Sequence, residues 1–209
     1  MIELIDNFFQ FSVLVISTLG AGLLFYKSQL QTYLLLTCFF ATFALGSLYW
    51  TLHFLLLNYT PQIFYVADLA WIASYLFLLT LLHILSSPDE REFRHVAMWL
   101  VPFYCIPQLI LYLRYGDILL NLLLCGLTMS IGWYSIRGLI YARRQTGKEK
   151  DMQFFHIAVL SIIVLEYCLW TASCFWISDT YTNPYFWIDF LLTASFFVLL
   201  PATKNAVGL

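Results

Sequence analysis

The sequence predicts an all-α integral membrane protein, a bundle of seven transmembrane helices, on three observations. Of the 209 residues, 62% are hydrophobic and only 11% are charged. The mean hydropathy is +0.81. Soluble domains are about half apolar and about a quarter charged, so this chain lacks the polar surface that a globule needs in water. Besides the composition and the hydropathy, the apolar runs are long, close to the ~20 residues that a helix needs to cross a bilayer.

Seven such runs follow one another along the chain. The predicted spans are 8–26, 30–57, 63–85, 96–113, 118–141, 154–177 and 185–203. Turn-forming segments separate several of them, namely 58–61, 86–89 and 179–184,. None of the runs alternates as a strand does, and all exceed the length of barrel strands, so helices satisfy their backbone in lipid. One seven-helix domain, 1–209, is therefore expected.

The first run is expected to be a retained helix rather than a signal peptide. The residues before it include Glu3 and Asp6 instead of basic side chains, and no small-residue cleavage site follows,.

Lys and Arg residues fall almost entirely into alternate connections. Nine of the ten lie in one set: Lys27, Arg91, Arg94, Arg137, Arg143, Arg144, Lys148, Lys150 and Lys204. Only Arg114 lies in the other set. Because positive loops stay in the cytoplasm, we expect a multi-pass protein of the cell membrane with its N-terminus outside and its C-terminus inside. The longest connection, 142–153, is a basic cytoplasmic loop that could also dock a protein partner.

Several classes of function find no support in the residues. The formal net charge of −2 leaves no basic patch, so we expect no nucleic-acid partner,. The sequence shows no G-x-S-x-G elbow, and its five cysteines have neither metal-ligand spacing nor a disulfide framework,. We therefore expect neither an enzyme nor a bound metal or cofactor, and the lipid bilayer is the one partner that composition implies.

Two segments predict an internal repeat. Residues 68–79 and residues 189–200 both read D-x4-A-S-aromatic-x-x-L-L. A parallel duplication of three helices (the first three and the last three spans), joined by 96–113 as a linker, explains this match. Chance similarity between Leu- and Ala-rich helices is the alternative. Parallel repeats occur in transporters, which bind substrate at the repeat interface.

Carboxylates within apolar spans are costly and tend to face a cavity or a partner. Glu166 lies about halfway along its span, and Asp68 and Asp189 lie nearer the outer boundary, at the depth of His53. Helical spacing places aromatic side chains on the same faces. We therefore predict an outward-facing cup of acidic and aromatic groups that binds a small molecule. Its predicted ligand-binding residues are Asp68, Glu166, Asp189, His53, Trp50, Trp71, Trp170, Trp187, Tyr49 and Tyr75. In the alternative interpretation, the aromatics form interfacial belts and the acids form interhelical hydrogen bonds.

The plan resembles two families at the level of topology. Segments 65–79 and 189–200 resemble helices three and seven of microbial opsins. That resemblance implies a lysine four residues after Asp189, where this chain has Thr193, so a retinal Schiff base is excluded. The dipeptides Pro61-Gln62 and Pro107-Gln108 resemble those of the SWEET and PQ-loop transporters. That family carries its Pro-Gln dipeptides in helices one and five. Here they lie in a turn and in the fourth predicted span, so the positions do not match.

The expected function is binding and transport of a small molecule, with Glu166 or one of the aspartates exchanging a proton. Two alternatives remain open. One is a receptor-like sensor, similar to the seven-helix input modules of bacterial sensor kinases, that signals through a partner protein. The other is a structural subunit of a membrane complex.

Overall fold

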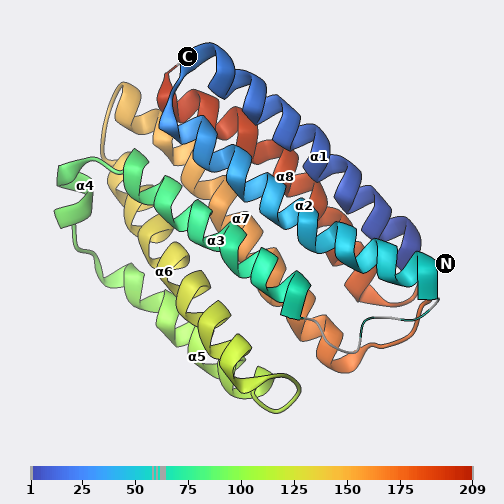
Figure 1. Cartoon of the computed structure of the whole chain (residues 1–209). Helices are drawn as coiled ribbons and strands as arrows, with labels where there is room; N and C mark the ends of the chain where they lie inside the picture. The colour runs from blue at the N-terminus through green and yellow to red at the C-terminus, as the bar shows by residue number, and fades with distance from the viewer. Residues whose placement is uncertain (1, 58, 60, 62–64, 209) are drawn as a thin grey trace.

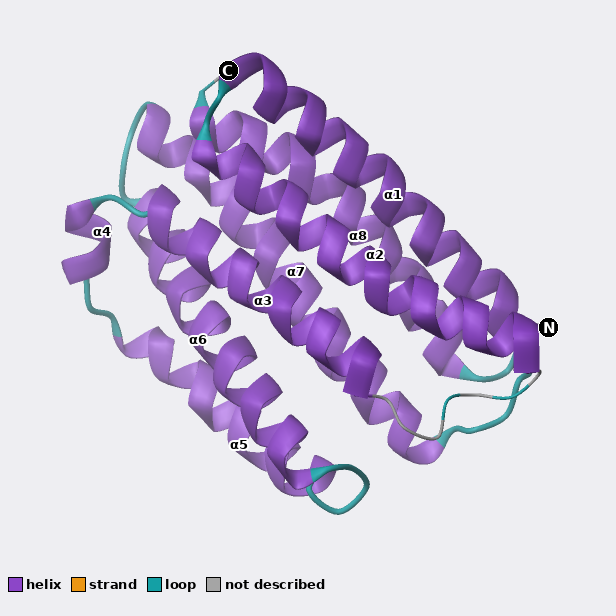
Figure 2. Cartoon of the chain, viewed as in Figure 1, coloured by secondary structure: helices purple, strands orange, loops and turns teal. Residues whose placement is uncertain are grey.

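The protein is described by a computed structural model that covers every residue except 1, 58, 60, 62–64 and 209. Every regular element in this described part is helical (Figure 2). The elements are α1 Ile2–Ser28, α2 Gln31–Leu57, α3 Tyr65–Leu85, α4 Pro88–Glu92, η1 Val96–Trp99, α5 Leu100–Tyr112, α6 Ile118–Arg143, α7 Lys148–Phe175 and α8 Pro184–Val207. The all-α prediction is confirmed. Gln62 of the first Pro-Gln dipeptide and Asn58 of the first turn lie outside the described residues.

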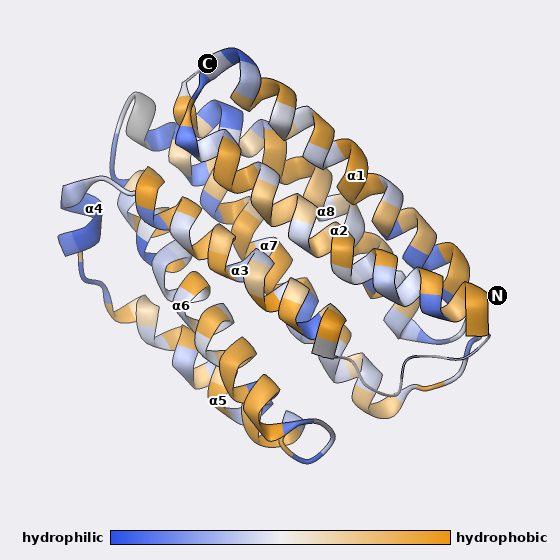
Figure 3. Cartoon of the chain, viewed as in Figure 1, coloured by the Kyte–Doolittle hydropathy of each residue, from blue (hydrophilic) through white to orange (hydrophobic). Residues whose placement is uncertain are grey.

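Six of the helices are long and apolar enough to cross a membrane: α1, α2, α3, α6, α7 and α8. Their apolar side chains also cover the surface. On α1, for example, Ile16, Leu19 and Leu23 are 59%, 62% and 60% exposed. Figure 3 shows hydrophobic residues along the length of the helices and hydrophilic residues gathered towards their ends and in α4. Because so much contiguous apolar surface is unfavourable in water, the chain is a multi-pass helical membrane protein.

The predicted span 96–113 forms a shorter apolar segment. It begins with the 3-10 helix η1, where His95 Nδ1 accepts a hydrogen bond from the Ala97 amide at 3.1 Å. It continues as the thirteen-residue α5. Pro102 lies in the first turn of α5, where a missing N–H leaves no intrahelical hydrogen bond unmade. Since η1 and α5 are shorter than the six long helices, the seventh crossing stays a prediction.

The helices pack side by side as an elongated bundle, and the two termini lie at opposite ends of it (Figure 1). We call these the N end and the C end. Helix α1 packs between α2 and α8, α3 packs on α2 and α6, and α7 packs on α6 and α8. Helix α5 lies at one edge, against α6 and α7. The short helix α4 and the connection at 144–147 lie at the C end.

Aromatic rings fill the core where α2, α3 and α8 meet. The ring of Phe43 on α2 lies 4.8 Å from that of Phe196 and 6.2 Å from that of Tyr75, measured between centroids. Gly46, one turn further along α2, leaves room for Trp71, whose Nε1 is only 2.6 Å from the place where a Cβ would stand. This close approach brings the indole of Trp71 against α2 and towards the N end of the bundle.

Candidate functional site

Polar side chains from three helices meet in the interior near the N end. Asp6 and Gln10 lie one turn apart on α1, on the same face,. Gln10 Nε2 donates a hydrogen bond to Asp189 Oδ1 of α8 at 2.7 Å, and Gln10 Oε1 accepts one from Ser47 Oγ of α2 at 2.6 Å. The carboxyl group of Asp6, one turn before Gln10, interacts with that of Asp189. All four side chains are buried.

A second acid extends this group into α7. Glu166 Oε1 accepts a hydrogen bond from Trp170 Nε1 at 3.0 Å. The carboxyl group of Glu166 also interacts with the Asp189 carboxyl and with the Tyr75 hydroxyl of α3. We call this group the N-end acidic cluster; its members are Asp6, Gln10, Ser47, Tyr75, Glu166, Trp170 and Asp189.

Two features make the cluster unlike ordinary interhelical contacts. First, the charged groups acting on Asp6, Glu166 and Asp189 are other carboxyls, with no basic side chain among the described residues near them. Second, several buried polar atoms in and beside the cluster have no hydrogen-bond partner within the described part of the chain. They are Asp6 Oδ1, Trp71 Nε1, Tyr75 Oη, Glu166 Oε2 and Thr193 Oγ1. Buried polar groups are nearly always satisfied in native proteins, so this concentration of unpartnered atoms marks the cluster as the candidate site.

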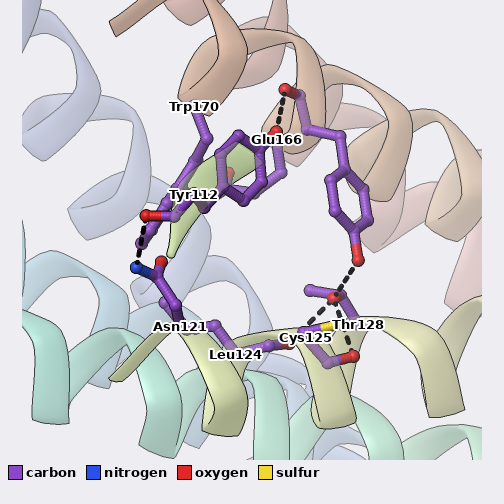
Figure 4. Close-up of a pocket in the computed structure, with 8 residues that line it drawn as sticks. Tyr112, Asn121, Leu124, Cys125, Thr128, Glu166 and Trp170 are labelled. Atoms are coloured by element: carbon purple, nitrogen blue, oxygen red, sulfur yellow. Dashed lines mark hydrogen bonds between the residues drawn. The ribbon is translucent and has the colours of Figure 1, made fainter. Parts of the chain in front are cut away.

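Glu166 also lines a small cavity between α5, α6 and α7. Its lining residues are Tyr112, Asn121, Leu124, Cys125, Thr128, Glu166, Tyr167 and Trp170. Figure 4 shows Asn121, Leu124, Cys125 and Thr128 along one face of α6, with Trp170, Glu166 and Tyr112 across from them. The cavity volume is about 20 Å³, which holds about one water molecule. A sugar or amine of ordinary size does not fit in a cavity of this volume.

Hydrogen bonds hold the walls of this cavity in place. Tyr112 Oη donates to the Tyr167 carbonyl oxygen at 2.9 Å, and Asn121 Nδ2 donates to the Tyr112 carbonyl oxygen at 3.1 Å. The hydroxyls of Thr128 and Tyr167 are 2.8 Å apart. The polar face of α6 is therefore tied to α5 and α7, and Glu166 and Trp170 are the lining residues that also belong to the N-end acidic cluster.

The ten residues predicted as one cup are placed in three groups. Glu166, Asp189, Trp170 and Tyr75 belong to the N-end acidic cluster. Trp71 and Trp50 adjoin it: their rings are 6.3 Å apart, and Trp50 Nε1 donates to Glu3 Oε1 at 3.2 Å. The remaining four lie elsewhere.

Tyr49 and His53 lie in the last third of α2, towards the N end of the bundle, with ring centroids 6.1 Å apart. His53 Nδ1 is 2.9 Å from the Tyr59 carbonyl oxygen. Trp187 is 57% exposed and donates to the Tyr181 carbonyl oxygen at 2.9 Å, as an interfacial tryptophan does,. Asp68 is buried on α3, where the neighbouring acid is Asp117 at the start of α6.

Sequence reasoning missed Asp6, Gln10 and Ser47. The acid at position 6 was interpreted only as evidence against a signal peptide. The available signal was the spacing of Asp6 and Gln10: two polar residues four apart in an otherwise apolar helix share one face, and that face is buried against α2 and α8.

Comparisons of this chain with protein-family models, with curated proteins and with solved structures find no match. The site is therefore interpreted from its own chemistry.

Proposed function

We propose that this chain is a non-enzymatic membrane transporter that binds a small polar molecule at the N-end acidic cluster. The observation that carries the proposal is the set of three buried acids, Asp6, Glu166 and Asp189, contributed by three helices and facing no basic side chain in the described structure. An acid within a membrane span costs about 2.5–3.5 kcal/mol on insertion scales. A purely structural contact could use neutral side chains, whereas binding a proton or a solute gives these acids a use.

The arrangement of the chain supports a seven-crossing topology for this transporter. At 2.0 Å and 1.5 Å rise per residue, η1 and α5 together are about 28 Å long, close to the ~30 Å of a hydrocarbon core. An odd number of crossings agrees with termini at opposite ends of the bundle (Figure 1). Nine of the ten Lys and Arg residues belong to the connections and helix ends at the C end, which favours a cytoplasmic C end.

Matching local geometry favours the proposed duplication. Ser74 Oγ donates to the Trp71 carbonyl oxygen at 2.6 Å, and Ser195 Oγ donates to the Leu192 carbonyl oxygen at 2.6 Å. The next residue in each copy, Tyr75 or Phe196, is fully buried against Phe43. In this proposal α1–α3 and α6–α8 are the two halves, and substrate binds where Asp189 and Glu166 meet the helices of the first half.

The closed cavity requires that the helices separate during transport, because a site of about 20 Å³ admits only water. Trp50, Trp71 and Trp170 lie around the acids and suit a ligand with a cationic or flat polar face. Opening of the N end would expose these rings together with Glu166.

Flux into proteoliposomes tests the proposal. Sugars, amines and nucleosides are first screened by tryptophan fluorescence of the purified protein, and responding compounds are then measured for uptake. Glu166→Gln is expected to abolish uptake. Asp117→Asn is the control, since Asp117 is an exposed helix cap and Asn caps equally well. If none of the compounds changed the tryptophan fluorescence, the proposal would be contradicted.

The sensor alternative is favoured by an open groove at the C end. It is lined by Lys150, Asp151, Gln153, Phe154, Ile157, Asn205 and Gly208. Lys150, Asp151 and Gln153 fall in the predicted loop 142–153, but the structure places them in the first turns of α7. A signalling partner would dock there. Saturable binding with no uptake of the same compound would favour this function over transport.

A further inference from the structure

We propose that Asp6 and Asp189 form a proton-binding pair, in which two buried carboxyl groups share a single proton, and that this proton is the ion exchanged during transport. The second half of this inference rests on the proposed function, whereas the first half does not. The pair joins α1 to α8, the first helix of one proposed half to the last helix of the other.

The geometry leaves a proton as the means of compensating the charge. Asp6 and Asp189 are 1% and 3% exposed, Gln10 one turn from Asp6 bonds to Asp189 Oδ1 at 2.7 Å, and the two carboxyl groups interact. Two like charges this close in a medium of low dielectric constant repel too strongly for both to remain ionised. One proton held between them removes half of the charge and supplies the hydrogen bond that neither carboxylate can donate.

The groups that face the pair from the surrounding helices do not supply a positive charge. These titratable neighbours are Glu3 on α1, Tyr75 on α3, Glu166 on α7 and Tyr185 on α8. From α2 the facing group is the Ser47 hydroxyl, which bonds to Gln10. Each neighbour is neutral or acidic, so the environment favours retention of the proton.

The link between α1 and α8 does not depend on the interaction of the two carboxyl groups alone. Gln10 already links α1 to α8 through Asp189 and α1 to α2 through Ser47. Asp6 adds no further hydrogen bond through its Oδ1, which is buried without a partner among the described residues.

Independent polar groups lie beside the pair and are also unsatisfied. The hydroxyl of Tyr75 is fully buried, interacts with Glu166 and Asp189, and makes no hydrogen bond in the described structure. Thr193 Oγ1, one turn after Asp189 on α8, is likewise fully buried and unpartnered. These groups can bond to water that enters when α1 and α8 separate. The proton then passes to that water, and both carboxylates are left ionised and hydrated.

Infrared spectroscopy of the whole protein in lipid nanodiscs tests the pair directly, because a protonated carboxyl group has a C=O stretch separate from that of a carboxylate. Wild-type protein grown with carboxyl-¹³C aspartate is compared with protein grown with carboxyl-¹³C glutamate at neutral pH. We expect an aspartate-derived band of a protonated carboxyl. Asp6→Asn and Asp189→Asn are each expected to remove the same component, because one proton serves both residues. Asp68→Asn, which changes a buried acid elsewhere, should leave that component in place.

The outcomes separate this inference from the proposed function. Absence of an aspartate-derived band in labelled wild-type protein would overturn the pair, and this measurement needs no variant to fold. Two different components, each removed by one substitution, would indicate independent acids and would also overturn it. A shared component in a protein without uptake of any compound would keep the proton pair and remove its assignment to transport. Uptake that shows no pH dependence would overturn the assignment of the proton as the exchanged ion.

Discussion

Acids are buried at both ends of the bundle, and the two ends compensate them differently. At the C end, Glu90 of α4 accepts a hydrogen bond from Ser86 at 2.8 Å and lies 3.7 Å from Nε2 of His156. The charges of Arg137 and Arg91 also act on Glu90. We call Ser86, Glu90, Arg91, Arg137 and His156 the C-end ionic cluster. The N-end acidic cluster has no comparable base in the described structure.

The difference separates an acid used for structure from an acid available for binding. Burial raises the pKa of Glu90, and the Ser86 hydrogen bond and the arginine charges offset part of that rise. Arg137 in turn donates to the Arg91 carbonyl oxygen at 3.1 Å and lies over the ring of Tyr134 at 4.7 Å. Glu90 thus joins α4 to α6 and α7 and serves packing. The acids at the N end have only neutral hydrogen-bond partners, Gln10 for Asp189 and Trp170 for Glu166, and no basic side chain near them in the described structure.

Removal of the acid at the C end should have the largest effect on stability. Glu90→Ala removes the acceptor of the buried Ser86 hydroxyl and the negative charge that acts on the buried Arg137. Such a loss beside a buried charge costs more than the roughly 1–3 kcal/mol of an unsatisfied neutral group. Thermal unfolding of the protein in detergent, followed by circular dichroism, measures the loss. Glu90→Gln keeps the side-chain volume and the acceptor for Ser86, so it should cost less. Equal stability of Glu90→Ala and wild type would remove the structural role of the C-end ionic cluster.

A smaller loss is expected from the glycine that admits His156 to the C-end ionic cluster. A Cβ on Gly138 would overlap Nε2 of His156 and stand 2.7 Å from Oε1 of Glu90. Overpacking of this kind costs about 1–3 kcal/mol, so Gly138→Ala should unfold at a lower temperature than wild type.

Gly126 provides the matched control on the same helix, since nothing lies within 4 Å of the place where its Cβ would stand. Gly126→Ala should leave stability unchanged or raise it by up to about 1 kcal/mol, because Ala is the better helix former. Equal changes in stability from the two substitutions would mean that contact with His156 does not decide the outcome.

Hydropathy and run length predicted the helices well, because a lipid solvent permits few other structures for long apolar runs. The six long helices overlap six predicted runs, although α8 continues to Val207 where the run was expected to end at 203. The site was predicted only in part. Glu166 and Asp189 lie together, but Asp68, which the predicted repeat matches to Asp189, lies away from them because α3 packs on α6 while α8 packs on α1. A sequence motif fixes the face of a helix but not which neighbour covers that face.

The smallest effect on stability is expected at the N end, and it completes the contrast between the two clusters. Asp189→Asn keeps the oxygen that accepts from Gln10 and adds an amide that can donate to Asp6. One neutral hydrogen bond contributes about 1 kcal/mol net. The free energy of unfolding of Asp189→Asn should therefore stay within about that amount of the wild-type value. Thermal unfolding of Asp189→Asn beside Glu90→Ala, in the same detergent and at the same pH, measures both. A loss at Asp189 as large as that at Glu90 would mean that the N-end acidic cluster is also structural. A small loss leaves these acids free to exchange protons as the helices move.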